Sequence, residues 1–249
     1  MRHESFDTPG PLRIRVESAS GSIELDTVDG AKTEVELDGT GDDVEEARIE
    51  LRERSDGHEL VVQTHPRAGF RLFRLNTKGI DVRIRAPHGA TVEISSASAD
   101  VEGRGRYAKV EVNSASGDVT FEEIEGDAQA NTASGDVEIR RIGGSGKVQS
   151  ASGDVEIGSA DSSLKVQTAS GDLEIGSVAS GEVTLQTASG DISVGVKPGS
   201  KLWIDARSMS GETSSELEVG DSAPSGEGPL VEVRATAMSG DIRVRRAPA

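Results

Sequence analysis

The residues of this chain best suited to chemistry are carboxylates and hydroxyls that recur at a fixed spacing. The motif Ser/Thr-Ala-Ser-Gly-Asp begins at residues 114, 132, 150, 168 and 187. Oxygen ligands of this kind suit hard cations such as calcium, so a string of cation sites is one hypothesis. The last three positions of each copy are the candidate site residues Ser116, Gly117, Asp118, Ser134, Gly135, Asp136, Ser152, Gly153, Asp154, Ser170, Gly171, Asp172, Ser189, Gly190 and Asp191.

A structural role for the same residues is the interpretation that we favour. If the copies stack at strand spacing, about 4.8 Å, neighbouring carboxylates repel by about 0.9 kcal/mol in a water-like dielectric. Hydroxyls and backbone amides at the carboxylate's own corner would compensate this charge. We therefore predict no catalytic residue, no cofactor and no dedicated metal site, and we expect calcium to change the melting temperature only if the cation hypothesis holds.

Three other groups of residues are possible functional sites. Gly143–Lys147 resembles a phosphate-binding loop, but Arg141 replaces its first glycine and Val148 its hydroxyl residue, so a strand connection is expected. Thr132, Thr168 and Thr187, each followed two residues later by serine, could form a flat ice-binding array. No His-x-x-x-His metal-ligand spacing occurs among the four histidines, which are His3, His58, His65 and His88.

The elements that must position the motif are strands. Degenerate copies begin at residues 96, 208 and 237, which gives successive spacings of 18, 18, 18, 18, 19, 21 and 29 residues. Apolar residues alternate with polar ones on both sides of the motif, and a period of two is typical of a strand. The inward-facing residues have even numbers up to Val112 and odd numbers from Val119 on, so the chain must bend between them. The glycine of the motif is expected to form this corner with positive φ.

Apolar residues at equivalent positions define five columns. Each copy of the repeat is too small to be stable alone and would bury its apolar side chains only against the next copy. We therefore predict an all-β fold, a parallel β-solenoid (β-helix) with about 18 residues per coil. The inward columns are Val110, Ala128, Gly146, Leu164 and Val183; Val112, Ala130, Val148, Val166 and Leu185; Val119, Val137, Val155, Leu173 and Ile192; Phe121, Ile139, Ile157, Ile175 and Val194; and Ile124, Ile142, Ala160 and Val178.

Two parts of the chain depart from the clean repeat. Residues 1–90 are predicted as an irregular N-terminal β segment with a degenerate coil and a hairpin around Ser55-Asp56-Gly57, and Phe70, Leu72 and Phe73 suggest a cap over the first coil. Residues 91–249 are predicted as the solenoid, with a loop inserted at 212–229 that is rich in Ser, Gly, Glu and Pro.

Composition excludes several classes of partner. The 249 residues carry 27 basic and 44 acidic side chains, so the formal charge is 27 − 44 = −17. Phosphate backbones and anionic lipids repel such a chain, which argues against nucleic acid and membrane surfaces. Six aromatic residues (four Phe, one Trp and one Tyr) cannot fill a thick core, which again favours a narrow aliphatic one.

The motif and the segment Ile80–Ile94 together carry a resemblance. The chain resembles a bacterial and archaeal family of β-strand-repeat domains of unknown function, often labelled putative adhesins, in which an Arg-x-Pro-x-Gly-Ala turn leads into Ser/Thr-x-Ser-Gly-Asp-Val repeats. The resemblance covers roughly residues 12 to 246. It implies a right-handed β-solenoid with a structural or surface-interaction role instead of catalysis.

We expect a non-enzymatic, adhesin-like scaffold that presents repeated surface side chains to a protein or glycan partner. The alternatives are a self-assembling filament, a calcium-binding β-helix and a carbohydrate-active β-helix. No apolar stretch of signal-peptide or membrane-spanning length occurs in the printed sequence, so no membrane insertion is expected and the chain as written is predicted to be cytoplasmic. Removal of a leader would instead place it at the cell surface.

Overall fold

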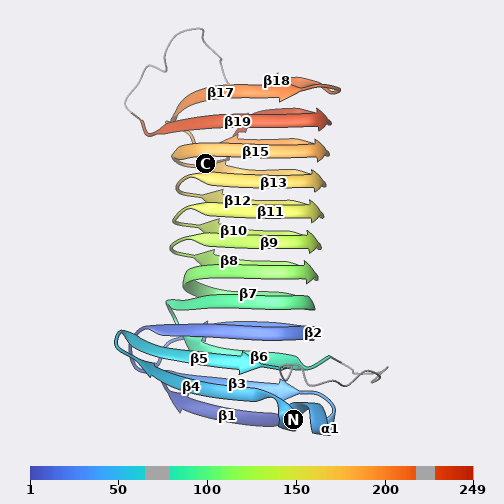
Figure 1. Ribbon diagram of the computed structural model, residues 1–249. Coiled ribbons are helices and arrows are strands. Elements are labelled where there is room, and N and C mark those ends of the chain that lie inside the picture. The colour runs from blue at the N-terminus through green and yellow to red at the C-terminus, as the bar shows by residue number, and fades with distance from the viewer. Residues whose placement is uncertain (65–78, 217–227, 249) are drawn as a thin grey trace. The chain divides into compact units, whose positions relative to one another are not determined.

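A computed structural model of the chain describes residues 1–64, 79–216 and 228–248 (Figure 1). Nearly every described element is a β-strand, and the strands form two compact units, Met1–Glu122 and Glu123–Ala249. Strand β8 (Val119–Ile124) spans the boundary between them. The chain therefore has the predicted all-β class, and each unit is described by itself.

Unit 1 combines parallel and antiparallel pairing around one long strand, β2. From Arg13 to Asp26, β2 pairs in parallel with β7, while its other edge pairs in parallel with β5 and then with β6. Antiparallel pairs β1–β3, β3–β6 and β4–β5 complete the unit. Its elements are β1 (Arg2–Asp7), β2 (Leu12–Val28), β3 (Lys32–Asp38), α1 (Gly41–Glu46), β4 (Arg48–Arg54), β5 (Gly57–Gln63), β6 (Asp81–Pro87) and β7 (Ala90–Ser116).

The predicted hairpin around Ser55-Asp56-Gly57 is confirmed. Strands β4 and β5 pair antiparallel with Leu51 opposite Leu60, and Gly57 has a φ of 141°. The short helix α1 was not predicted. The proposed cap residues Phe70, Leu72 and Phe73 lie outside the described residues.

The core of unit 1 contains two of the chain's six aromatic side chains. Tyr107 and Phe121 are buried and meet edge to face, with ring centroids 5.3 Å apart. A Cβ atom on Gly103 would clash with the ring of Phe121, so glycine at this position makes room for the aromatic side chain. The Tyr107 hydroxyl donates to the carbonyls of Leu25 at 2.7 Å and Arg104 at 3.1 Å. This satisfies the one polar atom of a fully buried ring.

Unit 2 consists of two parallel stacks of strands (Figure 1). One stack contains β9, β11, β13 and β15, and the other contains β10, β12, β14 and β16. The strands are β9 (Ala128–Ser134), β10 (Val137–Ile142), β11 (Gly146–Ser152), β12 (Val155–Ala160), β13 (Leu164–Ser170), β14 (Leu173–Val178), β15 (Gly181–Ser189), β16 (Ile192–Val196), β17 (Lys201–Ser208), β18 (Thr213–Ser215), β19 (Leu230–Ser239) and β20 (Ile242–Arg246).

The strand registers of unit 2 place equivalent repeat residues side by side. Val137 pairs with Val155, which pairs with Leu173, which pairs with Ile192. All four side chains are at most 1% exposed. The predicted inward columns are therefore confirmed within this unit, and aliphatic side chains form its core.

The order of the last two coils differs from the order of the sequence. We expected each coil to lie on the preceding one, but β15 pairs with β19, and β17 pairs with the other edge of β19. Strand β16 likewise pairs with β20, whose other neighbour is β18. The coil of β19 and β20 thus lies between two coils that precede it in the chain. In the sequence, residues 216–229 separate β18 from β19.

The predicted inserted loop, 212–229, was wrong at its start, because Thr213–Ser215 form strand β18. Most of the rest of that range, at residues 217–227, lies outside the described residues. The strands expected after it are present as β19 and β20. The only helix in residues 1–64, 79–216 and 228–248 has six residues, and no described helix is long and apolar enough to cross a membrane.

Candidate functional site

The predicted corners are positions where glycine is required. Gly135, Gly153 and Gly171 have φ values of 121°, 132° and 135°, a region that side chains with a Cβ rarely adopt. A Cβ on Gly153 would also clash with the carbonyl oxygen of Gly135 in the neighbouring coil. The glycine amides donate across the coils, as from Gly153 to Ser170 O at 3.1 Å. Backbone conformation and close stacking therefore both select glycine here.

The aspartates of the motif bind the backbone of the next coil. Oδ1 of Asp136 accepts the N–H of Asp154 at 2.8 Å, and Oδ1 of Asp154 accepts the N–H of Asp172 at 2.8 Å. The same contact joins Asp172 to Asp191 at 2.7 Å and Asp191 to Asp241 at 2.8 Å. Our expectation that the amides would come from the carboxylate's own corner was wrong. The carboxylate reaches the adjacent coil because stacking brings the next amide within 3 Å.

Unit 1 contains the same contact with one substitution. Oδ1 of Asp100 accepts the N–H of Asp118 at 3.1 Å. In the coil of β2, Ser22 occupies the position of the aspartate, and both its N–H and its hydroxyl donate to Oδ1 of Asp81 at 2.9 Å. A neutral residue therefore separates the carboxylates of Asp81 and Asp100 in this column.

The motif serines and threonines have different environments. Ser116, Ser134, Ser152, Ser170 and Ser189 are exposed. Thr132, Thr168 and Thr187 are instead buried, at 8%, 8% and 4% exposure. The Thr132 and Thr168 hydroxyls donate to the serine carbonyls two residues later, at 2.9 and 3.0 Å. The ice-binding array is thus contradicted, because its threonine hydroxyls are committed to the corner backbone.

Within the described parts of the chain, no three His, Asp, Glu or Cys side chains form a group that could hold a metal ion. His3 is exposed on β1, and His88 Nδ1 lies 2.8 Å from the Thr27 hydroxyl. His58 lies on β5, and His65 falls outside the described residues. The cation hypothesis for the aspartate column stays a prediction.

Outward-facing side chains of unit 2 also form columns. We call Asn131, Gln149, Gln167 and Gln186 the amide column, since strand register places them side by side. Gln149 Nε2 donates to Gln167 Oε1 at 3.3 Å, and Gln167 donates to Gln186. On the other stack, the acidic column of Glu138, Glu156 and Glu174 is aligned in the same way. Equal spacing predicted the alignment, but the bonds between amides depend on rotamers that spacing does not encode.

An ion pair between a buried carboxylate and an exposed guanidinium group in unit 1 was not predicted from the sequence. Glu59 on β5 is 1% exposed, and its Oε2 accepts Arg54 Nε at 3.1 Å and Nη2 at 2.5 Å. The hydrogen bond from Arg54 lowers the pKa of Glu59, while burial opposes this shift. Glu59 Oε1 has no protein partner among the described residues, but Glu59 borders a hollow of about 160 Å³. A polar hollow of this size has room for water that would solvate the oxygen.

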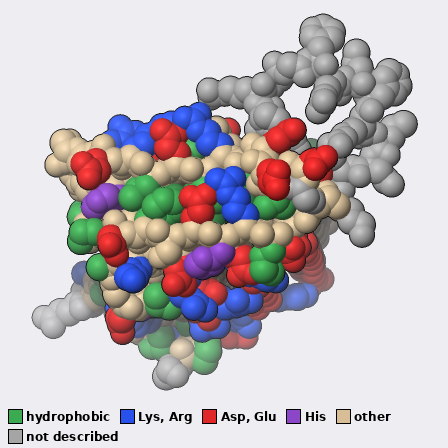
Figure 2. Space-filling view, turned by 90° about the horizontal axis from the view of Figure 1, so that it is seen from below, with side chains coloured by type: hydrophobic (Ala, Val, Ile, Leu, Met, Phe, Trp, Pro, Cys, Tyr) green, Lys and Arg blue, Asp and Glu red, His purple; other side chains and the backbone are tan. Residues whose placement is uncertain are grey.

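Further guanidinium groups lie near this pair. Arg52 Nη1 lies 3.8 Å from Glu59 Oε2, and Arg15 is joined to Glu93 at 2.9 Å. Figure 2, which views the molecule from below, shows acidic and basic side chains interspersed on that face. The buried carboxylate is thus held by guanidinium groups, as a buried charge requires.

Parallel strand stacks, glycine corners, a narrow aliphatic core and outward polar columns define an all-β protein of solenoid-like type. The profile of the Toastrack DUF4097 family matches residues 12–245, so the chain belongs to this family. No protein with a curated function matches the chain.

Several solved structures are similar to the chain. A putative adhesin from Bacteroides fragilis NCTC 9343 is 12% identical, with 98% of this chain and 96% of that chain covered and a TM-score of 0.42. A putative cell adhesion protein from Clostridium sporogenes ATCC 15579 is 11% identical, with 98% and 99% covered and a TM-score of 0.35. A putative adhesin from Parabacteroides merdae ATCC 43184 is 12% identical, with 96% and 95% covered and a TM-score of 0.38.

Proposed function

We propose that the protein is a non-enzymatic, adhesin-like scaffold whose outward columns bind a protein or glycan partner. The observation that carries the proposal is the amide column, where Asn131, Gln149, Gln167 and Gln186 face outward from successive parallel strands. Each amide has both donors and an acceptor, and the column repeats them at strand spacing, about 4.8 Å. A partner with regularly spaced hydroxyls or peptide groups could form the same bond several times.

Lysine side chains add a second binding element beside the amides. Lys147 and Lys165 are register partners two residues before Gln149 and Gln167, and both are exposed. Ammonium groups next to amides suit a glycan that carries hydroxyls and carboxylates, or an acidic protein segment. The proposal also includes right-handed coils of about 18 residues each. It further requires that the protein is located where it can meet such a partner.

The absence of assembled catalytic groups supports a binding role. Serines, aspartates and histidines are the usual components of a hydrolase, but across residues 1–64, 79–216 and 228–248 the three histidines lie on β1, on β5 and after β6, outside the repeated motif. The motif aspartates in unit 2 already accept backbone N–H groups. These carboxylates act as structural acceptors and not as a general base.

A binding screen with the full chain tests the proposal. The immobilised protein is probed with arrays of glycans and acidic peptides, and the variant Gln149→Ala/Gln167→Ala is compared with the control Glu138→Ala/Glu156→Ala on the other stack. We expect the first variant to lose about tenfold in affinity, or about 1.4 kcal/mol, while the control binds as wild type. Equal loss in both variants, or no binding by wild type, would contradict the amide column as the binding surface.

A further inference from the structure

Among the described residues, strand β17 is the last strand of its stack in unit 2 and pairs on one edge only, with β19. Leu202, Ile204 and Ala206 point into the same columns as Val231, Val233 and Ala235 of β19. The three β19 side chains are fully buried at 0% exposure, whereas the three on β17 are only half-buried. The apolar columns therefore end at β17, where the described residues place no further strand over them (Figure 1).

Within residues 1–64, 79–216 and 228–248, half of the backbone groups of β17 face away from its one partner strand. The N–H of Lys201 donates toward β19, to Pro229 O at 2.8 Å, and the N–H of Met209 donates to Ala237 O at 3.2 Å. Because successive residues of a strand direct their N–H and C=O groups to opposite edges, Leu202, Ile204 and Ala206 direct theirs away from β19. An edge of this kind can pair with another strand.

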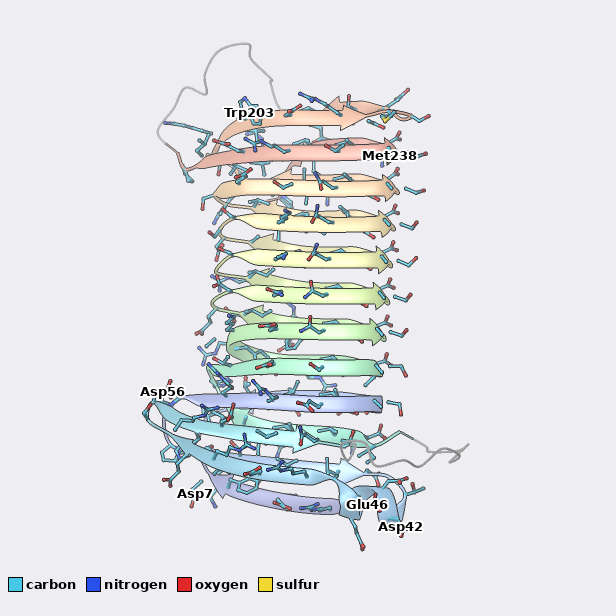
Figure 3. All side chains as sticks on the ribbon, viewed as in Figure 1. Asp7, Asp42, Glu46, Asp56, Trp203 and Met238 are labelled. Atoms are coloured by element: carbon cyan, nitrogen blue, oxygen red, sulfur yellow. The ribbon has the colours of Figure 1, made fainter. Side chains whose placement is uncertain are left out.

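Exposed apolar side chains gather at the same end. Of five large apolar residues that are exposed in the described chain, only Met1 lies elsewhere. Trp203 on β17 is 41% exposed, and Met238 on β19 is 57% exposed (Figure 3). Leu230 and Met209, at 44% and 82%, lie at the start of β19 and just after β17. The large exposed apolar side chains described in unit 2 are therefore confined to β17, β19 and the residues next to them.

We propose that this edge binds a second copy of the chain, with β17 antiparallel to β17 of the partner copy around a two-fold axis at Trp203. In this register Leu202 faces Ile204 of the other copy, so the open columns of both copies are closed by apolar side chains. Residues 202 and 204 are also those whose backbone groups point outward, so they form the hydrogen-bonded pair. The contact is self-complementary, as a two-fold interface requires.

Charge selects this register over its neighbours. With the axis at Trp203, Lys201 faces Asp205 of the other copy on both sides. Asp205 is also paired with Arg207 of its own strand at 2.9 Å. Moving the axis by one residue to Ile204 would oppose Lys201 and Arg207, and moving it to Asp205 would oppose two aspartates. An axis at Ala206 pairs Asp205 with Arg207, but it places Ile204 against Ser208. The register at Trp203 combines opposite charges with a pair of large aliphatic side chains over the open columns, whereas the register at Ala206 leaves Ile204 against a serine.

The strand is also locally suited to association in an acidic protein. β17 carries Lys201, Asp205 and Arg207, a net charge of +1, in a chain of net charge −17. Repulsion between copies therefore comes from the rest of the surface, and salt screens it. We expect a weak dimer that strengthens as ionic strength rises.

Sedimentation of the full chain over a range of concentrations, at about 0.5 M salt to screen the surface charge, tests this inference. Wild type is expected to form dimers and nothing larger, because a two-fold contact uses up both edges. Lys201→Asp and Asp205→Lys each create like-charge pairs and should weaken the dimer about tenfold. The double variant Lys201→Asp/Asp205→Lys restores opposite charges and should return to within about threefold of wild type.

Lys109→Asp is the matched control, since it makes the same charge change on an exposed position of β7, a strand that pairs on both edges. It should associate like wild type. Four results would overturn the inference: a monomer at all concentrations, growth beyond a dimer, single reversals no worse than the control, or a double variant that stays weak. None of these results bears on the amide column, so the proposed function is tested separately.

Discussion

Asp154 joins two neighbouring coils of unit 2. Its N–H donates to Asp136, and its Oδ1 accepts the N–H of Asp172, each at 2.8 Å. A charged acceptor strengthens such a bond, while the neighbouring carboxylates oppose the accumulated charge. The residue thus contributes to stability through its oxygen more than through its charge.

Substitution of Asp154 separates these two contributions. Asp154→Ala leaves the N–H of Asp172 without its acceptor and should lower the free energy of unfolding by about 1–2 kcal/mol. Asp154→Asn keeps an oxygen in place and removes repulsion, so its effect should stay within about 0.5 kcal/mol. Urea denaturation measures both. If asparagine costs as much as alanine, charge is the main contribution and the oxygen-acceptor account is wrong.

Glu59 makes unit 1 sensitive to acid. The hydrogen bond from Arg54 lowers its pKa below the ordinary value of 4.5, so the folded state holds the carboxylate more strongly than the unfolded state does. This stabilisation is complete above the unfolded pKa and is lost as the pH falls through the folded pKa. We expect Glu59→Gln to flatten the decline of the urea midpoint between about pH 5 and 3. The control Glu156→Gln, in unit 2, should keep the wild-type decline, and identical profiles for all three proteins would contradict this role.

At the scale of elements, neighbouring strands fit by pairing small residues with large ones. Gly146 on β11 lies beside Leu164 on β13, and a Cβ at residue 146 would lie 2.6 Å from Leu164 Cδ1. The same relation holds in unit 1, where Gly103 makes room for Phe121. The size of a side chain that fits at one position of a column therefore depends on the side chain at the neighbouring position.

A double-mutant cycle tests the fit of β11 against β13. Gly146→Ala overpacks the column and should cost about 1–3 kcal/mol. In a Leu164→Val background the added methyl has more room, so the same change should cost at least about 0.5 kcal/mol less. Thermal or urea unfolding of the four proteins gives the coupling. Additive costs would show that the two side chains do not compete for space.

The pattern of the sequence predicts part of these elements. The period of two and the equal spacing correctly predicted the column of Val137, Val155, Leu173 and Ile192. The Gly-Asp corner correctly predicted the positive φ of Gly153. Spacing does not encode which amide an aspartate reaches, since that depends on contacts between coils. The burial of Glu59 was missed because a Glu between a His and a Leu carries no signal that distinguishes it from a surface residue.

At the scale of the whole chain, the order of the coils is the feature least accessible to sequence. In unit 2 the coil of β19 lies between β15 and β17, and in unit 1 strand β2 lies between β7 and the later strands β5 and β6. Copies of one repeat have similar faces, so a coil can stack on any of several others. Only the length of the connecting segments limits the choice.

The melting temperature of the intact chain, measured with added calcium and with a chelator, tests whether the motif aspartates bind a cation. The Oδ1 atoms that would bind a cation already accept N–H groups, as in Asp136 and Asp172. We therefore expect millimolar calcium and a chelator to leave the melting temperature unchanged apart from a small general effect of ionic strength on a chain of net charge −17. A marked rise with calcium, but not with magnesium at equal strength, would support the cation hypothesis instead.

The stacked register is tested most directly by disulfide crosslinking between neighbouring coils. The sequence contains no native cysteine, so only the introduced cysteines can react. Gln149 and Gln167 are register partners on adjacent strands, whereas Gln149 and Gln186 are two strands apart. Neighbouring strands lie within the Cα range of about 4.4–6.8 Å that a disulfide needs, and strands two apart do not. With oxidant or a short thiol crosslinker, Gln149→Cys/Gln167→Cys should link within one chain and Gln149→Cys/Gln186→Cys should not. Equal linking of both pairs, or of neither, would contradict the stacked register.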